Sequence, residues 1–321
     1  MEEDNRPAAP RPRCPTSVTP ALAPPARHAP SSDVPARTRV GAVRSTGESL
    51  REYGRGVAGG LLFSLPLLYT MEVWQGGFTM PPERQLAYVI LALVLLLGYN
   101  RYAGLHPDVT WAEVAIDSVE EMGIGLLLSA LVLLLIGRIG PGQDAGEVVG
   151  RIVVEAVTVA IGVSVGTAQL GGDDNDSKAE MTDKDRVSFG GQLTLAICGA
   201  VLFAANVAPT EEIVVIGVEL AGYQLAATGL VTLGLGALIL FYSDFRGARH
   251  WVRVEGFGGV LRGAVITYAV GLLTSAAILW LFGRFDGVGV SVMLGQTVAL
   301  AVASTIGASA GRLLLQGAGH E

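Results

Sequence analysis

Charged residues are scarce in this chain. Asp, Glu, Lys and Arg make up only 16% of its 321 residues, whereas soluble globular proteins carry about 25%. Half of the residues are hydrophobic, and apolar runs close to the thickness of a lipid bilayer recur along the chain. In lipid, every backbone polar group needs a partner within its own segment, which favours helices. The composition therefore predicts an all-α, polytopic transmembrane helical bundle whose main partner is the lipid bilayer.

The residues that build metal and catalytic centres are equally few. Two cysteines, Cys14 and Cys198, cannot form a disulfide framework. The four histidines are scattered, and the sequence contains no phosphate-binding loop, GxSxG, HExxH or CxxC motif. We therefore expect no enzyme, no cofactor and no metal centre. The net charge of −7, with acids and bases in separate loops, gives no indication of a nucleic-acid partner.

Two polar stretches interrupt the apolar sequence. Nine of the fifteen prolines fall before position 36, so residues 1–50 are expected to form a disordered tail that buries too little apolar surface to fold. The arginines of this tail could contact anionic lipid head groups, or the tail could be a solvated linker. Residues 171–189 are expected to form an acidic cytoplasmic linker.

Eight apolar segments are predicted to cross the membrane. Their lengths suit a bilayer of ordinary thickness, and each is expected to form one helix. The segments are 56–75, 85–103, 121–138, 148–170, 190–209, 222–243, 263–283 and 288–311. Trp111–Val119 is interpreted as an amphipathic lead-in to the third of them. Lys and Arg concentrate in alternate loops, which predicts a cytoplasmic N-terminus in a bacterial inner membrane.

An internal repeat is the most informative pattern. Thr70-x-Glu72 recurs 140 residues later as Thr210-x-Glu212, and Gly137-Arg138 recurs as Gly283-Arg284. The matches keep their order over more than a hundred residues, with offsets between 140 and 146. This predicts two tandem four-helix repeats, residues 51–170 and 190–315. An even number of spans in each repeat gives both the same orientation, with an axis along the membrane normal.

The repeat directs attention to Glu72 and Glu212 as candidates for an ion or proton path, because charged groups in a membrane are costly. Pro66 and Pro209 are predicted to interrupt the preceding helices and to free a backbone carbonyl. Such a carbonyl beside a threonine and a carboxylate is rich in oxygen ligands. The supporting residues are Thr70, Thr210, Asn206 and Glu211. The alternative is that both glutamates simply reach water at the membrane boundary.

Glu155 is a further candidate, inside the fourth apolar segment. Arg151 lies one turn earlier on the same helical face, which favours a structural ion pair between the two side chains. The alternative is a role in transport. The apolar residues that follow Glu212 could dip into the membrane or lie flat on its surface.

The runs 62–72 (LFSLPLLYTME), 206–212 (NVAPTEE) and 162–166 (GVSVG) resemble those of a bacterial family known only as integral membrane proteins with a domain of unknown function. The resemblance covers about 51–311. It implies about seven spans, which conflicts with eight, and the segments 148–170 and 209–221 are where we expect the difference. It also implies a small partner protein encoded nearby.

Taken together, these patterns favour a secondary transporter or channel for a small ion, with carboxylates of the two repeats lining the path. The alternative is a non-catalytic membrane scaffold or sensor subunit acting with a small membrane-associated partner. A homo-oligomer is compatible with both, and the sequence does not identify the ion.

Overall fold

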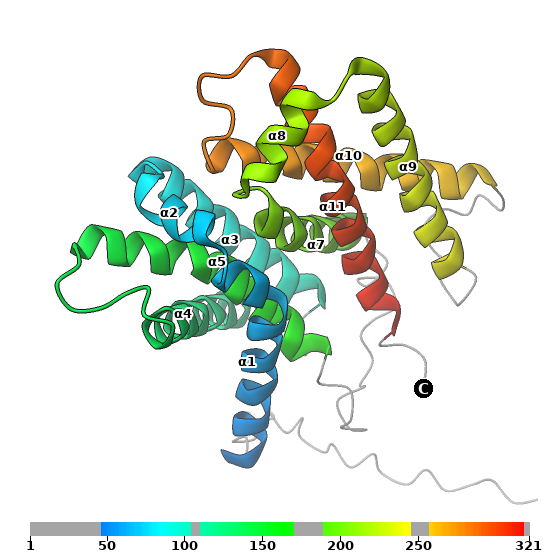
Figure 1. Cartoon of the computed structure of the whole chain (residues 1–321). Coiled ribbons are helices and arrows are strands. Elements are labelled where there is room, and N and C mark those ends of the chain that lie inside the picture. Colours follow the sequence, from blue (N-terminus) through cyan, green and yellow to red (C-terminus); the bar gives the residue numbers. More distant parts are fainter. Residues whose placement is uncertain (1–45, 104–109, 170–188, 245–256, 318–321) are drawn as a thin grey trace, which may run out of the picture. The chain divides into compact units, whose positions relative to one another are not determined.

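A computed structural model describes residues 46–103, 110–169, 189–244 and 257–317 (Figure 1). Residues Arg44–Glu321 form one compact unit, and the described part of it is helical without a strand. The acidic linker and nearly all of the N-terminal tail lie outside the described residues. The first described helix begins at Thr46, within the last residues of the predicted tail.

The helices in the described part of the chain fall into two series of five. The first series is α1 (Thr46–Leu68), α2 (Met71–Thr79), α3 (Pro82–Ala103), α4 (Trp111–Leu135) and α5 (Ala145–Gln169). The second series is α7 (Phe189–Val207), α8 (Glu211–Glu219), α9 (Gly222–Asp244), α10 (Phe257–Leu281) and α11 (Val290–Gly317). We call them the first half and the second half.

Seven of these helices are long and apolar enough to cross a membrane, and a bent pair adds an eighth span if it is counted as one. The pair is α1 and α2, whose axes differ by 86° across the break at residues 69–70. The sequence predicted one span over 56–75, interrupted at Pro66, whereas the structure divides this segment between α1 and α2. The ambiguity between seven and eight spans therefore lies at the first segment, whereas 148–170 falls on the single long helix α5.

Each half is built around its last helix. Helix α5 packs against α1, α2, α3 and α4, and α11 packs against α7, α8, α9 and α10. Glycines let the backbones approach closely. A side chain at Gly59 or Gly166 would overlap the backbone of the other helix, and the same holds for Gly199 against Gly307. The α5 span is 72% buried, the highest share among the candidate spans.

The helix boundaries of the two halves correspond closely. Helices α2 and α8 both contain nine residues and begin at Met71 and Glu211, an offset of 211 − 71 = 140. Helices α4 and α10 both contain 25 residues and begin 257 − 111 = 146 residues apart. Gly77 of α2 touches Gly150 of α5, and Gly217 of α8 touches Gly295 of α11. These are the offsets found in the sequence, although the duplication itself stays a prediction.

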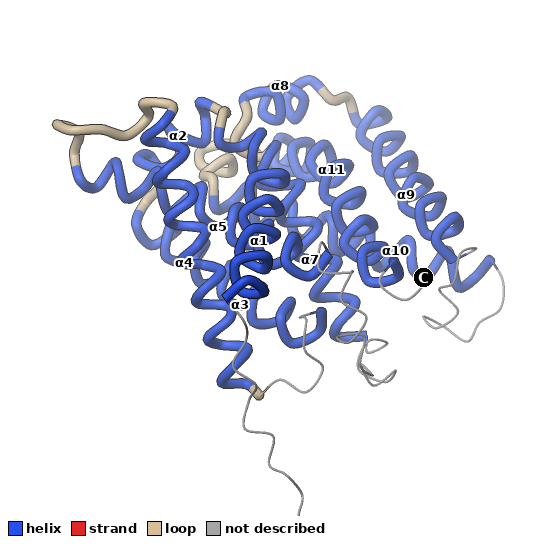
Figure 2. Tube along the Cα trace, turned by 90° about the horizontal axis from the view of Figure 1, so that it is seen from below, coloured by secondary structure: helices blue, strands red, loops and turns tan. Residues whose placement is uncertain are grey.

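The short helices α2 and α8 lie at the same end of the bundle, which we call the α2/α8 face (Figure 2). At this face α4 and α10 end in matching turns. Gly137 and Gly283 have φ angles of 71° and 72°, and the Arg138 and Arg284 amides donate to the Leu133 and Leu279 carbonyls over 2.8 and 2.9 Å. This is the Schellman arrangement, in which a left-handed glycine ends the helix. It explains the glycine in both Gly-Arg pairs.

The two halves meet mainly through α3 and α7. A side chain at Gly98 of α3 would collide with Thr194 of α7, and the Cys198 thiol lies 3.7 Å from the Leu95 carbonyl. The Asn206 amide donates to the Phe63 carbonyl of α1 over 3.4 Å. The interface is therefore close-packed, with few polar contacts.

Candidate functional site

Glu155 is a carboxyl group buried near the middle of a membrane-spanning helix. It lies ten residues from the start and thirteen from the end of the span Ala145–Ala168, which places it about 2 Å from the midpoint along the axis. Its side chain has 0% exposure. Within the described residues neither carboxyl oxygen has a hydrogen-bond partner. An unpaired charge at such a place is strongly unfavourable, so the group is a functional candidate.

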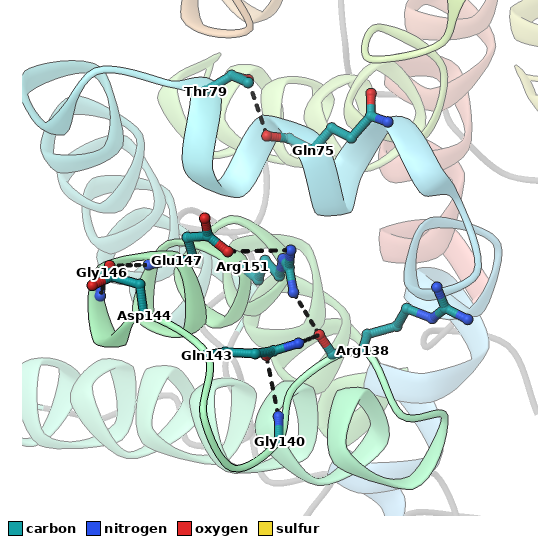
Figure 3. A network of polar contacts seen from close by, with 9 residues as sticks. All are labelled: Gln75, Thr79, Arg138, Gly140, Gln143, Asp144, Gly146, Glu147 and Arg151. Carbon is teal, nitrogen blue, oxygen red and sulfur yellow. Dashed lines mark hydrogen bonds and ion pairs between the residues drawn. The ribbon is translucent and has the colours of Figure 1, made fainter.

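Arg151 does not neutralise this carboxyl group. Its guanidinium lies 3.6 Å from Glu147 and donates to the Arg138 carbonyl over 2.6 Å (Figure 3). It also lies 5.3 Å from the centre of the Phe78 ring. The predicted ion pair between Arg151 and Glu155 is therefore wrong. The side chain turns toward the exposed start of α5, where a charge keeps contact with water at a lower cost.

The antiparallel packing of α1 and α5 indicates what Glu155 faces. A Cβ on Gly60 would lie 3.2 Å from the Val159 carbonyl, so these positions are directly opposed. Moving four residues back along α5 to Glu155 corresponds to moving four residues forward along α1 to Ser64. Glu155 shares the helical face of Val159 because residues four apart lie above one another. The carboxyl group therefore lies opposite the last turn of α1, just before the break.

The backbone carbonyls at this break already accept hydrogen bonds. The Thr70 hydroxyl donates to the Pro66 carbonyl over 2.6 Å, and the Thr70 amide donates to the Leu67 carbonyl over 2.9 Å. The Trp74 indole donates to the Leu68 carbonyl over 3.0 Å. Ser64 is fully buried and its hydroxyl donates to the Gly60 carbonyl. The carbonyls at the end of α1 thus already have hydrogen-bond donors of their own.

Tyr88 of α3 is a polar neighbour of Glu155. Its side chain has 0% exposure, and its hydroxyl has no hydrogen-bond partner in the described part of the chain. The Glu155 carboxylate and this hydroxyl are close enough to interact electrostatically. Two polar groups that both lack partners in one buried region are unusual, since nearly all buried polar groups are satisfied. They mark the centre of the candidate site.

The glutamates selected from the repeat lie elsewhere. Glu72 is half-buried in the first turn of α2, while Glu211 and Glu212 are exposed in the first turn of α8. Negative side chains are favourable at helix N-termini. The charges of Glu72 and Glu211 both act on Arg284, so one acid from each half approaches the same guanidinium. Glu212 has no such role, and its assignment to a path stays a prediction.

Arg284 lies between the two halves at the α2/α8 face. Its Nε atom donates to the Ala208 carbonyl over 3.3 Å. Burial lowers the pKa of this guanidinium from its ordinary value, while the negative charges of Glu211 and Glu72 act in the opposite direction. Arg84 completes the connection through an ion pair with Asp286. The face is therefore a network of charges that joins the halves.

The remaining predicted residues serve the ends of the helices. Pro66 lies inside α1, but Pro209 follows the end of α7 at Val207 and does not interrupt it. Because proline restricts the residue before it, helices commonly stop there. The Thr210 hydroxyl donates to the Val207 carbonyl over 2.9 Å, as Thr70 does to Pro66. Both threonine hydroxyls thus bond to carbonyls at the ends of the preceding helices, while the carbonyls one turn before Pro66 and Pro209 stay predicted ligands.

Asn206 keeps one unused atom. Its amide nitrogen donates to the Leu202 carbonyl over 2.6 Å, while its Oδ1 atom is buried without a partner among the described residues. It lies in the last turn of α7, on the side that faces α1. Asn206 is therefore an interface residue with one acceptor available to water or to an ion.

A second polar cluster, which sequence reasoning missed, joins three helices of the first half. Glu121 of α4 accepts a hydrogen bond from the Asn100 amide of α3 over 2.7 Å. The same amide donates to Ser118 over 3.1 Å, and its oxygen accepts from Ser164 of α5 over 3.0 Å. We call these four residues the Glu121 cluster. All the described hydrogen-bonding positions of the Asn100 amide are satisfied.

The missed signal was the position of Glu121. The acids before it suggested that the third span begins at residue 121, so Glu121 was taken as a boundary residue. Instead α4 is one helix from Trp111, with a capping box formed by Thr110 and Glu113. The amphipathic lead-in is thus continuous with the span. Extending the predicted third span back to its capping residue Thr110 would have placed Glu121 inside the helix and not at its start.

The apolar helices, the broken first span and the buried carboxyl group define a polytopic integral membrane protein. Residues 52–315 match the model of a family described as "Putative integral membrane protein (DUF2391)", and the chain belongs to that family. The family resemblance predicted from the sequence is confirmed. No curated protein and no solved structure matches the chain.

Proposed function

We propose that this protein is a secondary transporter or channel for a small cation or a proton, and that Glu155 is its central ion-binding group. The observation that carries the proposal is a carboxyl group with 0% exposure near mid-span and no described hydrogen-bond partner. Ionisable residues at such depth are rare and typically serve ion paths or proton relays. A cation or proton that binds Glu155 neutralises its negative charge, which the neighbouring side chains do not do.

The broken span supports a transport function for the same region. Transporter sites typically use discontinuous helices whose ends lie near the middle of the membrane. Here α1 ends opposite Glu155, and α2 continues at 86° to it. Ion entry is assigned to the α2/α8 face. There Glu72 and Glu211 provide negative charge around Arg284, and Asn206 offers an unoccupied acceptor.

The two halves are proposed to be tandem repeats with the same orientation. The equal offsets of their helices and of their glycine contacts support this. Position 155 then corresponds to Leu300, which lies 145 residues later and is also fully buried. A leucine fills this position in one half, so the fold does not require a carboxyl group there. The residues of the second half thus show which side chains the same helix arrangement can accept at the corresponding positions of the first half.

The sidedness follows from the sequence. Lys and Arg cluster in the tail and in the loops that would share its side, which supports a cytoplasmic N-terminus in a bacterial inner membrane. Most of these residues lie outside the described part of the chain. The α2/α8 face is accordingly assigned to the outer side.

The proposal is tested by ion flux into vesicles containing the purified protein. Wild type is compared with Glu155→Gln, and Glu147→Gln serves as the control because it places the same change in the exposed first turn of the same helix. We expect flux in wild type and the control, and a loss of at least roughly tenfold in Glu155→Gln. Equal flux in all three overturns the assignment of Glu155. No flux of any ion, with a small partner protein retained on purification, favours the scaffold or sensor alternative.

A further inference from the structure

The Glu121 cluster is a second polar site, and it shares helices α3 and α5 with the surroundings of Glu155. Ser164 lies nine residues beyond Glu155 on α5, or about 14 Å along the axis. Asn100 is three residues from the end of α3, and Ser164 is four residues from the end of the α5 span. Both ends are opposite to the α2/α8 face. The cluster therefore lies between Glu155 and the far side of the membrane.

Hydrogen-bond donors are directed at the Glu121 carboxylate. The Asn100 amide nitrogen lies 2.7 Å away, and the Ser164 hydroxyl is also in hydrogen-bonding reach of the same carboxylate. Donors of this kind stabilise the ionised carboxylate, which is the form able to accept a proton. They repel a metal cation, because the amide presents its N–H group and not its carbonyl oxygen.

Glu155 is equally unsuited to hold a metal cation. Hard metal cations bind about six or more oxygen ligands. Opposite Glu155, the carbonyls of Pro66, Leu67 and Leu68 each accept a hydrogen bond, so a cation would have to share these oxygens with the present donors. A proton needs a single oxygen atom and leaves these contacts intact. The chemistry of both sites thus favours a proton over a metal cation.

Comparison with the second half indicates that the cluster is not needed for packing. With the helix offsets of 140 and 146, Asn100 corresponds to Leu240 and Glu121 to Thr267. Ser118 corresponds to Ala264, which has 0% exposure. A half with the same helix order therefore packs with leucine, threonine and alanine at these three positions, while Ser164 has the buried Ser309 as its counterpart. Among the described residues, the second half also buries polar side chains, such as Gln296, Ser304 and Thr305, but its buried polar groups include no carboxyl group.

We propose that the transported species is the proton, and that the Glu121 cluster is a second proton-binding station between Glu155 and the face opposite α2 and α8. This rests on the proposed function and names its substrate. The O–H bond of the Glu155 acid breaks, and water carries the proton to the Glu121 carboxylate, where a new O–H bond forms. Glu121 then releases the proton to water on the far side. One O–H bond is lost and one is gained, with no change of oxidation state.

The test measures proton uptake by vesicles of defined lipid containing the full-length protein, using an internal pH dye and a membrane potential set with potassium and valinomycin. The same vesicles are tested for sodium uptake. Wild type is compared with Glu121→Gln and Asn100→Leu, the latter placing the second half's residue in the first half. Glu120→Gln is the matched control, since Glu120 is the adjacent exposed acid and accepts a hydrogen bond from Tyr53.

We expect proton uptake in wild type and in the Glu120 variant, and a loss of roughly tenfold or more in both cluster variants. All variants must elute as single species, and Glu121→Gln decides the outcome if Asn100→Leu does not fold. Wild-type proton uptake by Glu121→Gln overturns the second station. Sodium uptake without proton uptake overturns the proton assignment while the proposed function stands. The absence of any ion flux in wild type overturns the proposed function itself.

Discussion

Arg84 and Asp286 form a two-pronged ion pair between α3 of the first half and the loop that follows α10 in the second half. The Nη1–Oδ2 and Nη2–Oδ1 distances are 2.6 and 2.8 Å. The Arg84 guanidinium also lies 5.4 Å from the centre of the Trp280 ring. Bidentate geometry makes an exposed pair more effective than a single contact. This pair ties the halves at the α2/α8 face.

The pair makes stability depend on pH. The hydrogen bond from Arg84 is the main cause that holds the pKa of Asp286 below its ordinary value, so the pair stabilises the fold above about pH 4, the ordinary value for Asp. This contribution is lost as the pH falls through the lowered pKa. Asp286→Asn should therefore unfold at a lower temperature than wild type at pH 7, and the difference should vanish in acid. Thermal unfolding in detergent at several pH values measures this.

A double-mutant cycle provides the control. Arg84→Gln and Asp286→Asn should each lower the unfolding temperature, and the double variant should be no worse than the more damaging single variant. Fully additive losses would show that the two side chains act independently.

The glycine contact between α1 and α5 is predicted to tolerate no side chain. A Cβ on Gly166 would overlap Gly59, and the close backbone contact leaves no side chain that could move aside. Gly166→Ala should cost about 1–3 kcal/mol of unfolding free energy. Gly123→Ala is the control, because a Cβ there meets no atom within 4 Å and alanine favours a helix by roughly 0.5–1 kcal/mol. Denaturant titration of both variants checks the contrast, and equal losses would contradict the packing.

The left-handed glycine that ends α10 makes a separate prediction. Gly283 has a φ angle of 72°, a conformation that costs other residues about 1–2 kcal/mol. Gly283→Ala should therefore lower the unfolding free energy by about this amount. Gly140→Ala serves as the control, since Gly140 has no positive φ and no atom near its Cβ position. A neutral Gly283→Ala would argue against the Schellman turn.

The acids around Arg284 are predicted to act on the approach of the ion and not on its binding at Glu155. Replacing Glu72 and Glu211 by glutamine should reduce flux severalfold at low salt, because negative charge at an entrance raises the local cation concentration. At about 1 M salt the Debye length is near 3 Å, so this reduction should disappear. Flux at the two ionic strengths measures the effect. An equal reduction at both would place these acids in the binding step instead.

Much of the architecture could be predicted from composition and periodicity. The apolar segments from 85 to 311 all fall on observed helices, because bilayer-length apolar runs leave the backbone no other hydrogen-bonded form. The matched Gly-Arg pairs also directed attention to the ends of α4 and α10. The glycine of each pair ends its helix in a local turn, and a local turn depends on neighbouring residues alone.

The bend between α1 and α2 could not be read from hydropathy. Residues on both sides of Thr70 are apolar, so a window average sees one continuous segment. Pro66 does mark a weak point, but the direction of the chain after it depends on α2 packing against α5 through Gly77 and Gly150. Such contacts join residues that are far apart in the sequence, so a local hydropathy average does not contain them.

The site was mislocated for a similar reason. Arg151 and Glu155 have the spacing of a helical ion pair, and the sequence does not reveal that Arg151 turns to Glu147 and the Arg138 carbonyl. The repeat favoured residues present in both halves. Glu155 and Glu121 have a leucine and a threonine as their counterparts in the second half, so a search for matched residues passes over both acids.

The central claim is that Glu155 is present for ion transfer and not for packing. Replacing it with leucine, the residue at position 300, tests this most directly through proton uptake in vesicles, with the unfolding temperature of the same sample as its control. We predict that Glu155→Leu folds at least as stably as wild type, since a buried unpaired carboxyl group is unfavourable, and that its proton uptake is lost. A stable Glu155→Leu protein with wild-type uptake would contradict the account.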